Sequence, residues 1–122
     1  MDDTGTGDPD AGSPDRTDDP DAGTKSRLMH FLNLLLDDDE VSRWKAAEAL
    51  GRTGDPAAVD DLISTLWDED ARVRLKAAWA LGRIGDQRAY TPLQRLYRME
   101  DERAREIIKE ALENIRREMS RQ

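Results

Sequence analysis

The stretch Leu75–Asp86, LKAAWALGRIGD, repeats Trp44–Asp55, WKAAEALGRTGD, at a distance of 31 residues, and nine of the twelve positions are identical. Self-similarity at a fixed spacing of this size is typical of stacked arrays in which each repeat is one supersecondary unit. A second series has the same period, because Asp39, Asp70 and Asp101 are also 31 residues apart. The period therefore predicts a chain built from about three copies of one unit.

Each unit is predicted to hold two helices joined by a Gly-Asp turn. Gly54 and Gly85 can adopt the left-handed conformation that follows a helix end, and the aspartate after each can cap the next helix. Asp39, Asp70 and Asp101 stand where the other helix of each unit should begin. The pattern predicts six helices, over residues 25–36, 40–53, 56–67, 71–84, 87–98 and 101–119.

The predicted fold class is all-α, a short right-handed α-α superhelix with six helices in about three stacked units. The units cover residues 24–54, 55–85 and 86–119. In the last unit Glu113 and Arg116 replace the two glycines of the turn, Gly82 and Gly85. Without glycine the helix need not turn, so we expect it to run on and to cap the array with its charged outer side.

The acidity of the chain lies in its first residues. The formal net charge is −8, and residues 1–24, with eight aspartates and one arginine, supply −7 of it. Residues 1–23 hold too little apolar surface to offset their conformational entropy, so we predict a disordered acidic tail before a domain over residues 24–122. Such an acidic segment is typical of a salt-adapted microbe, and a GC-rich genome accounts for it equally well.

The composition argues against several kinds of site. There is no cysteine, and His30 is the only histidine, so we expect no metal and no cofactor. The many carboxylates fall at predicted helix starts, where capping explains them, and we assign no catalytic residue. The chain has neither a secretion signal nor an 18-residue apolar run, which favours a cytoplasmic protein without a membrane contact.

Two surfaces of the predicted array combine aromatic and charged side chains, as protein interfaces do. On the second helices of the units, the residues predicted to bind a partner are Asp60, Asp61, Ser64, Trp67, Arg88, Gln94, Arg95 and Arg98. On the first helices, Trp44, Leu75 and Trp79 fall on one apolar strip. Alternatively, the two tryptophans of this strip fold over the seam between neighbouring helices and stay mostly buried.

The first helix, over residues 25–36, has more apolar residues than its equivalents. Met29, Leu34 and Leu36 stand at positions that hold Asp60, Thr65 and Trp67 one unit later. Uncovered apolar patches tend to find a partner, so we expect this end to permit a homodimer.

Val73–Asp86, VRLKAAWALGRIGD, resembles the short-repeat branch of the HEAT-repeat family, the type first described in phycobilisome lyase subunits. The resemblance spans roughly residues 25–119 and implies a hydrogen-bonded ladder of aspartates and arginines between units. The residues at the ladder positions are Asp37, Arg43, Asp68, Arg74 and Arg105. Arg105 lacks the acid of the pattern, because Met99 stands there.

The predicted function is a non-catalytic scaffold or adaptor that binds another protein. The alternative, implied by the resemblance alone, is a subunit of a bilin-lyase-type or tetrapyrrole-carrying complex. Nucleic-acid binding, known in one branch of the family, is disfavoured because Asp60 and Asp61 would repel phosphate on the surface that should receive it.

Overall fold

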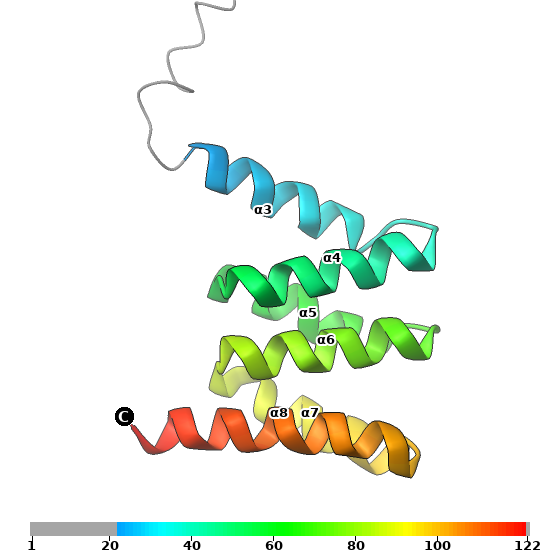
Figure 1. The fold of residues 1–122 in the computed structure, drawn as a ribbon, viewed down its shortest axis with the longest axis vertical. Helices are drawn as coiled ribbons and strands as arrows, with labels where there is room; N and C mark the ends of the chain where they lie inside the picture. The colour runs from blue at the N-terminus through cyan, green and yellow to red at the C-terminus, as the bar shows by residue number, and fades with distance from the viewer. Residues whose placement is uncertain (1–21, 122) are drawn as a thin grey trace, which may run out of the picture. The chain divides into compact units, whose positions relative to one another are not determined.

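The computed structural model describes residues 22–121, and these form six α-helices and two short 3-10 turns (Figure 1). The helices are α3 (Ala22–Leu34), α4 (Glu40–Thr53), α5 (Val59–Thr65), α6 (Ala71–Ile84), α7 (Tyr90–Met99) and α8 (Glu102–Ser120). The 3-10 turns Pro56–Ala58 and Gln87–Ala89 lead directly into α5 and α7. No strand occurs among the described residues, so the predicted all-α fold is confirmed.

The chain divides between His30 and Phe31, and the two parts are described separately. Residues 22–30 form most of α3, while residues 31–121 contain its last turn and all later helices. The disordered tail predicted for residues 1–23 lies outside the described residues, except for Ala22 and Gly23. These two residues are helical, so the helix begins before Thr24, where order was predicted to start.

The local signals of the repeat act as the sequence predicts. Gly54 and Gly85 end α4 and α6 with φ angles of 70° and 77°, which only glycine adopts without strain. Five aspartates cap helices or 3-10 turns by accepting a hydrogen bond from a backbone N–H of the first turn: Asp39, Asp55, Asp70, Asp86 and Asp101. Each cap contributes about 1 kcal/mol to helix stability.

Within residues 31–121 the helices form two layers. Helices α4, α6 and α8 lie side by side in the first layer, with α6 packed against both neighbours (Figure 1). In the second layer α5 packs against α6 and α7 packs against α8. The side chains buried between the layers are aliphatic, and the largest are Leu50, Val59, Leu62, Leu66, Val73, Leu81, Leu93, Leu96, Ile108 and Ile115.

One contact between first-layer helices occurs twice, 31 residues apart. A Cβ built on Gly51 would lie 2.9 Å from the Cα of Ala80, and one built on Gly82 would lie 2.7 Å from the Cα of Ala111. Glycine on one helix therefore lets the backbone of the next helix approach closely. The third glycine position holds Glu113, so α8 cannot receive another helix in this way, and it runs on to Ser120 as predicted.

The last unit differs from the unit before it in its second layer. Tyr90 and Tyr97 stand 31 residues after the buried Val59 and Leu66, but both are only half-buried. Leu93 and Leu96 are the buried residues of α7. The reason is that no other helix within residues 31–121 covers the side of α7 on which the two tyrosines lie.

Replacing Gly82 by alanine should destabilise the fold. An alanine normally stabilises a helix interior relative to glycine by about 1 kcal/mol. Here the added Cβ would meet Ala111 at 2.7 Å, and such overpacking costs about 1–3 kcal/mol. Urea denaturation followed by circular dichroism measures the change.

The control is Gly23→Ala in α3, where the nearest neighbouring atom to a Cβ is the Nη1 of Arg27 at 3.8 Å. This variant should unfold at an unchanged or slightly higher urea concentration. A Gly82→Ala protein as stable as the wild type would contradict the close approach of α6 and α8.

Candidate partner-binding surfaces

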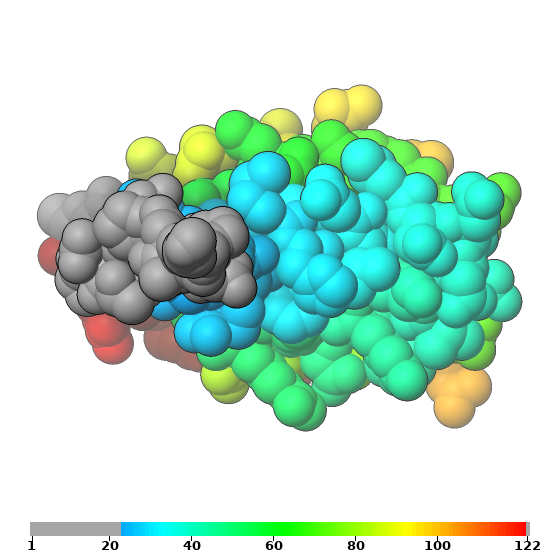
Figure 2. Space-filling model, turned by 90° about the horizontal axis from the view of Figure 1, so that it is seen from above, coloured from blue at the N-terminus to red at the C-terminus, as the bar shows by residue number. Residues whose placement is uncertain are grey.

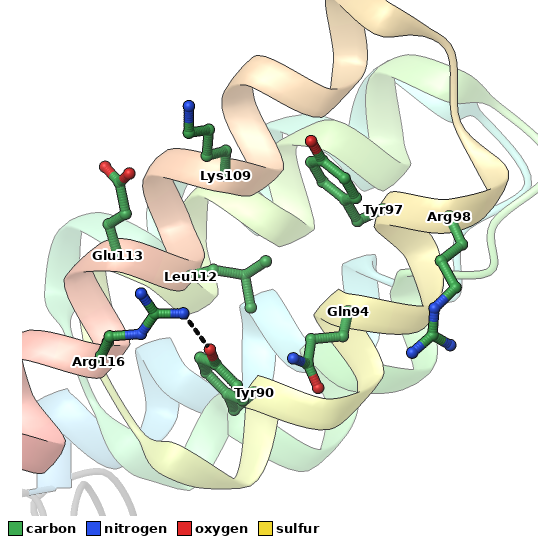
Figure 3. Close-up of a pocket in the computed structure, with 8 residues that line it drawn as sticks. All are labelled: Tyr90, Gln94, Tyr97, Arg98, Lys109, Leu112, Glu113 and Arg116. Carbon is green, nitrogen blue, oxygen red and sulfur yellow. Dashed lines mark hydrogen bonds between the residues drawn. The ribbon is translucent and has the colours of Figure 1, made fainter.

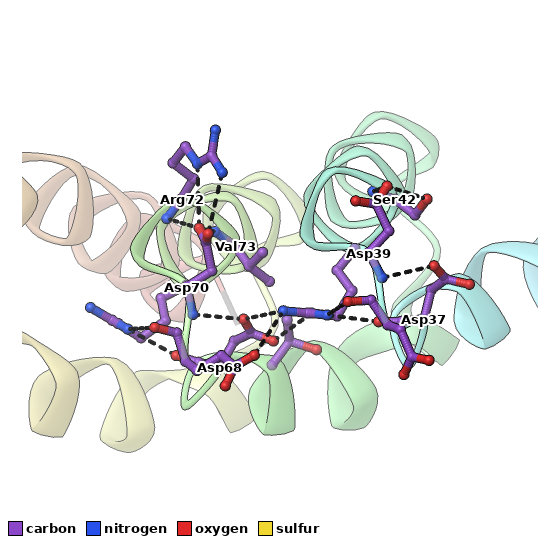
Figure 4. Close-up of polar contacts among 12 residues, drawn as sticks. Asp37, Asp39, Ser42, Asp68, Asp70, Arg72 and Val73 are labelled. Atoms are coloured by element: carbon purple, nitrogen blue, oxygen red, sulfur yellow. Dashed lines mark hydrogen bonds and ion pairs between the residues drawn. The ribbon is translucent and has the colours of Figure 1, made fainter.

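The arginine ladder joins the loops at one end of the helices (Figure 4). Arg43 is only 8% exposed. Its Nε and Nη2 donate to the two carboxylate oxygens of Asp68, at 2.8 and 3.2 Å. Its Nη1 donates to the backbone oxygens of Asp37 and Asp38, at 2.7 and 3.0 Å. The hydrogen bond to Asp68 raises the pKa of Arg43, so this guanidinium holds two successive loops together.

The second rung of the ladder has a different acid from the expected pattern. Arg74 donates from Nη1 to the backbone oxygen of Asp68 at 2.8 Å and from Nε to the carboxylate of Glu100 at 2.7 Å. Met99 stands at the aspartate position, but Glu100 follows it and is longer by one methylene, so its carboxylate reaches the arginine. Glu100 was not predicted as a ladder residue because it stands one residue off the 31-residue period.

Among the described residues, the third ladder arginine contacts backbone oxygens and an aromatic ring. Arg105 donates from Nε to the backbone oxygen of Tyr97 at 2.9 Å, and its guanidinium carbon lies 5.3 Å from the centroid of the Tyr97 ring. The guanidinium groups of Arg43, Arg74 and Arg105 therefore all hold the loops that connect the two layers.

Replacing Arg43 by lysine should destabilise the fold by about 1–3 kcal/mol, because one ammonium group cannot span a carboxylate and two backbone oxygens. The matched control is Arg52→Lys, since Arg52 makes an exposed bridge to Glu48 at 3.2 Å. Exposed bridges of this kind are worth about 0–0.5 kcal/mol. Thermal unfolding of both variants measures the difference, and equal losses would contradict the ladder's role.

The predicted tryptophan strip forms a groove across the first layer. Trp44 of α4, Leu75 and Trp79 of α6 and Ile107 of α8 line a groove of about 410 Å³, together with Arg72, Lys76 and Glu110. Ile107 was not predicted, because it stands one residue away from the position that the repeat would assign. The groove therefore continues the apolar strip onto a third helix.

Both groove tryptophans are half-buried over the seam between α4 and α6. A Cβ on Gly51 would lie 2.7 Å from the Trp79 ring, and the Nε1 of Trp44 is buried without a hydrogen-bond partner among the described residues. The Lys76 ammonium lies 5.5 Å from the Trp44 centroid and 5.4 Å from that of Trp79. One edge of each tryptophan ring is therefore packed inside the fold.

The predicted second-layer surface brings a tryptophan and an arginine together. Trp67, in the turn after α5, is 41% exposed, and the Arg95 guanidinium carbon of α7 lies 5.5 Å from its ring centroid. Asp61, Ser64 and Arg98 are also exposed, while Gln94 is half-buried. The two units therefore present one surface, with Trp67 beyond the end of α5 and Arg95 of α7 beside it.

A second pair of residues on this surface, Asp60 and Arg88, forms an ion pair between the two units. Arg88 bridges Asp60 at 3.3 Å and donates to the backbone oxygen of Pro56 at 3.2 Å. It also bonds the capping carboxylate of Asp86 at 2.9 Å, and this hydrogen bond lowers the pKa of Asp86. Asp60 and Arg88, predicted as partner-binding residues, thus contact each other in the free chain.

The end of the chain predicted to self-associate presents apolar side chains. Leu36 is 84% exposed and Met29 is 56% exposed, while Leu34 is half-buried. Figure 2 looks onto this end, where the cyan and turquoise atoms of residues 31–45 lie in front of the later helices. The Leu36 side chain is therefore accessible on the surface.

The described residues show neither a metal-binding cluster nor a membrane-spanning helix. No three histidine, cysteine or carboxylate side chains between residues 22 and 121 are grouped so that they could hold a metal ion. Within the same residues, no helix combines the length and apolarity needed to cross a membrane.

The stacked helix pairs, their 31-residue period and the arginine ladder define the chain as an α-helical repeat solenoid. The family model described as HEAT repeats matches residues 28–113, well over half of the chain, so the protein belongs to the HEAT-repeat family. Comparison with curated proteins gives no match. HEAT repeats commonly serve as protein-interaction scaffolds.

Proposed function

We propose that this protein is a non-catalytic scaffold that binds another protein through its second-layer surface. The observation that supports this most directly is the exposed Trp67 ring with the Arg95 guanidinium beside it. Tryptophan and arginine are the residue types most enriched at the energetic centres of protein interfaces. A stacked pair also loses little side-chain freedom on binding, which favours affinity.

The charges around Trp67 suggest how the partner is oriented. Asp60 and Asp61 lie on α5, while Arg95 and Arg98 lie on α7. A partner that places basic groups near α5 and acidic groups near α7 would complement this surface in one direction only. Such complementarity sets orientation and association rate more than affinity. The same aspartates disfavour a nucleic-acid partner, because they would repel phosphate.

The test uses the full chain as bait in an extract of its source organism at native salt, followed by purification of the captured protein. We expect the purified partner to bind the wild type at a defined stoichiometry, and Trp67→Ser to weaken the affinity by about 30-fold, the loss typical of a central interface tryptophan. Calorimetry measures both affinities.

Arg103→Gln is the matched control, because Arg103 is exposed on α8, outside the proposed surface. This variant should bind as the wild type does. A partner that binds Trp67→Ser and the wild type equally, or the absence of any captured protein, would overturn the proposal.

We also propose that the Leu36 end permits a homodimer. Light scattering of the free chain at several concentrations tests this, and Leu36→Lys should leave a monomer at all of them because it charges the exposed position. A wild-type monomer throughout would exclude the homodimer without affecting the scaffold proposal.

The alternative that we keep is a tetrapyrrole-carrying subunit, as in the phycobilisome-lyase branch that the sequence resembles. The groove over Trp44, Leu75 and Trp79 favours it, because an apolar floor lies beside Arg72 and Lys76, which suit the carboxylates of a tetrapyrrole. Titration with biliverdin should then quench tryptophan fluorescence and shift the bilin absorbance. No change in either signal would remove this alternative.

A further inference from the structure

A pocket of about 330 Å³ lies in the last unit, between α7 and α8 (Figure 3). Its α7 side consists of Tyr90, Gln94, Tyr97 and Arg98, and its α8 side consists of Lys109, Leu112, Glu113 and Arg116. In Figure 3 the Leu112 side chain points between the two tyrosines, and the Gln94 amide lies at the same opening. The pocket therefore has an apolar floor and polar edges.

The repeat explains why this pocket exists. Tyr90, Tyr97 and Leu112 stand 31 residues after Val59, Leu66 and Leu81, which are completely buried. The three later residues are only half-buried, because no further unit within residues 31–121 packs on them. The pocket thus lies on the side of the last described unit that none of these residues covers.

The residues around the pocket differ from their equivalents in a consistent way. Arg98, Lys109 and Arg116 replace Trp67, Ala78 and Gly85, while Glu113 replaces Gly82. Charged residues at the end of an array keep it from stacking further. A cap with only this purpose would not need two aromatic rings around an apolar side chain. The three cations against one carboxylate also give the pocket a positive balance.

One of the cations is held in place by the pocket itself. The Arg116 Nη2 donates to the Tyr90 hydroxyl at 2.7 Å, and the guanidinium carbon lies 5.9 Å from the ring centroid. A guanidinium has five N–H donors, so this bond leaves others for a ligand. Arg116 is therefore a pre-oriented donor at the edge of the apolar floor.

The shape of the pocket suits a short extended peptide. Tyr90, Gln94 and Tyr97 follow one face of α7 over about two turns, which is about 10 Å. Three residues of an extended chain cover the same length at about 3.3 Å each. The Gln94 amide can both donate to and accept from a peptide backbone. A free anion would fill only the charged edge and leave Leu112 uncovered.

We propose that this pocket binds an acidic peptide segment of a partner protein. One large apolar side chain of the segment would cover Leu112 between Tyr90 and Tyr97, and its carboxylates would pair with Arg98 and Arg116. Arginine and carboxylate form charge-assisted, often bidentate, hydrogen bonds. This contact is additional to the Trp67–Arg95 pair, and Gln94 and Arg98 border both sites.

The experiment measures fluorescence polarisation of three labelled heptapeptides with the full chain. The first has six acidic residues around a central leucine, the second has serine in place of the leucine, and the third has lysines in place of the acids. We expect only the first to bind well, with at least tenfold weaker binding of the other two. Equal binding of the serine peptide would mean surface charge alone and would overturn the proposal.

The variant that tests the residues is the double substitution Arg98→Gln and Arg116→Gln, which should weaken binding of the leucine peptide at least tenfold. Leu112→Ser should weaken it while leaving the charges intact, and Arg52→Gln on α4 is the matched control with unchanged binding. Circular dichroism melting curves verify that each variant is folded. Wild-type affinity in both folded pocket variants would overturn the proposal.

Two more measurements distinguish peptide binding in this pocket from binding elsewhere on the protein and from binding of a free anion. Trp67→Ser should bind the leucine peptide as the wild type does, so this proposal and the scaffold proposal can fail independently. A loss in Trp67→Ser as large as in the arginine double variant would place the peptide on the second-layer surface instead. Displacement by inorganic phosphate at constant ionic strength would assign the site to a free anion.

Discussion

The close approach of successive first-layer helices is the constraint on which the rest of the structure depends. Gly51 meets Ala80, and Gly82 meets Ala111, with no room for a Cβ at either glycine. This contact sets the distance between α4, α6 and α8, and with it the depth of the space that the second layer fills. The buried leucines and isoleucines pack at full density only at that distance.

The ladder arginines hold the loops in agreement with this helix spacing. The Arg43 guanidinium contacts the backbone of one loop and the carboxylate of Asp68 in the next. It can do both only when the two units lie at the distance that the glycine contact allows. Arg74 does the same with Glu100. Packing and polar contacts thus specify the same geometry, which is the consistency across levels that a stable fold requires.

The same constraint explains where the candidate binding features lie. Inside the array the apolar residues of each unit are covered by the next, so they are unavailable. At the last unit Tyr90, Tyr97 and Leu112 lose that cover, and charged residues surround them. On the second layer, Trp67 and Arg95 lie together because their helices are successive units of one stack. Features that bind a partner are therefore expected on the layer surfaces and at the ends of the stack.

The sequence by itself determined the helices, their order and those helix ends that glycine or a capping aspartate marks. These features depend on residues close together in the chain: Gly54 and Gly85 at the turns, the capping aspartates, and the loss of glycine at Glu113 and Arg116. Because the repeat places equivalent residues 31 apart, the helical repeat fold could be predicted from the period, while the family was indicated by the resemblance of Val73–Asp86.

Only the tertiary structure decided the contacts between residues that the period does not relate. Glu100 and Ile107 each stand one residue away from the position that the repeat assigns. Glu100 reaches Arg74 through its longer side chain, and Ile107 reaches the tryptophan groove from another helix, α8. The pairing of Arg88 with Asp60, the half-burial of Trp44 and Trp79, and the pocket around Leu112 depend on how the layers pack. A linear pattern does not contain that information, since burial is a property of all neighbours together.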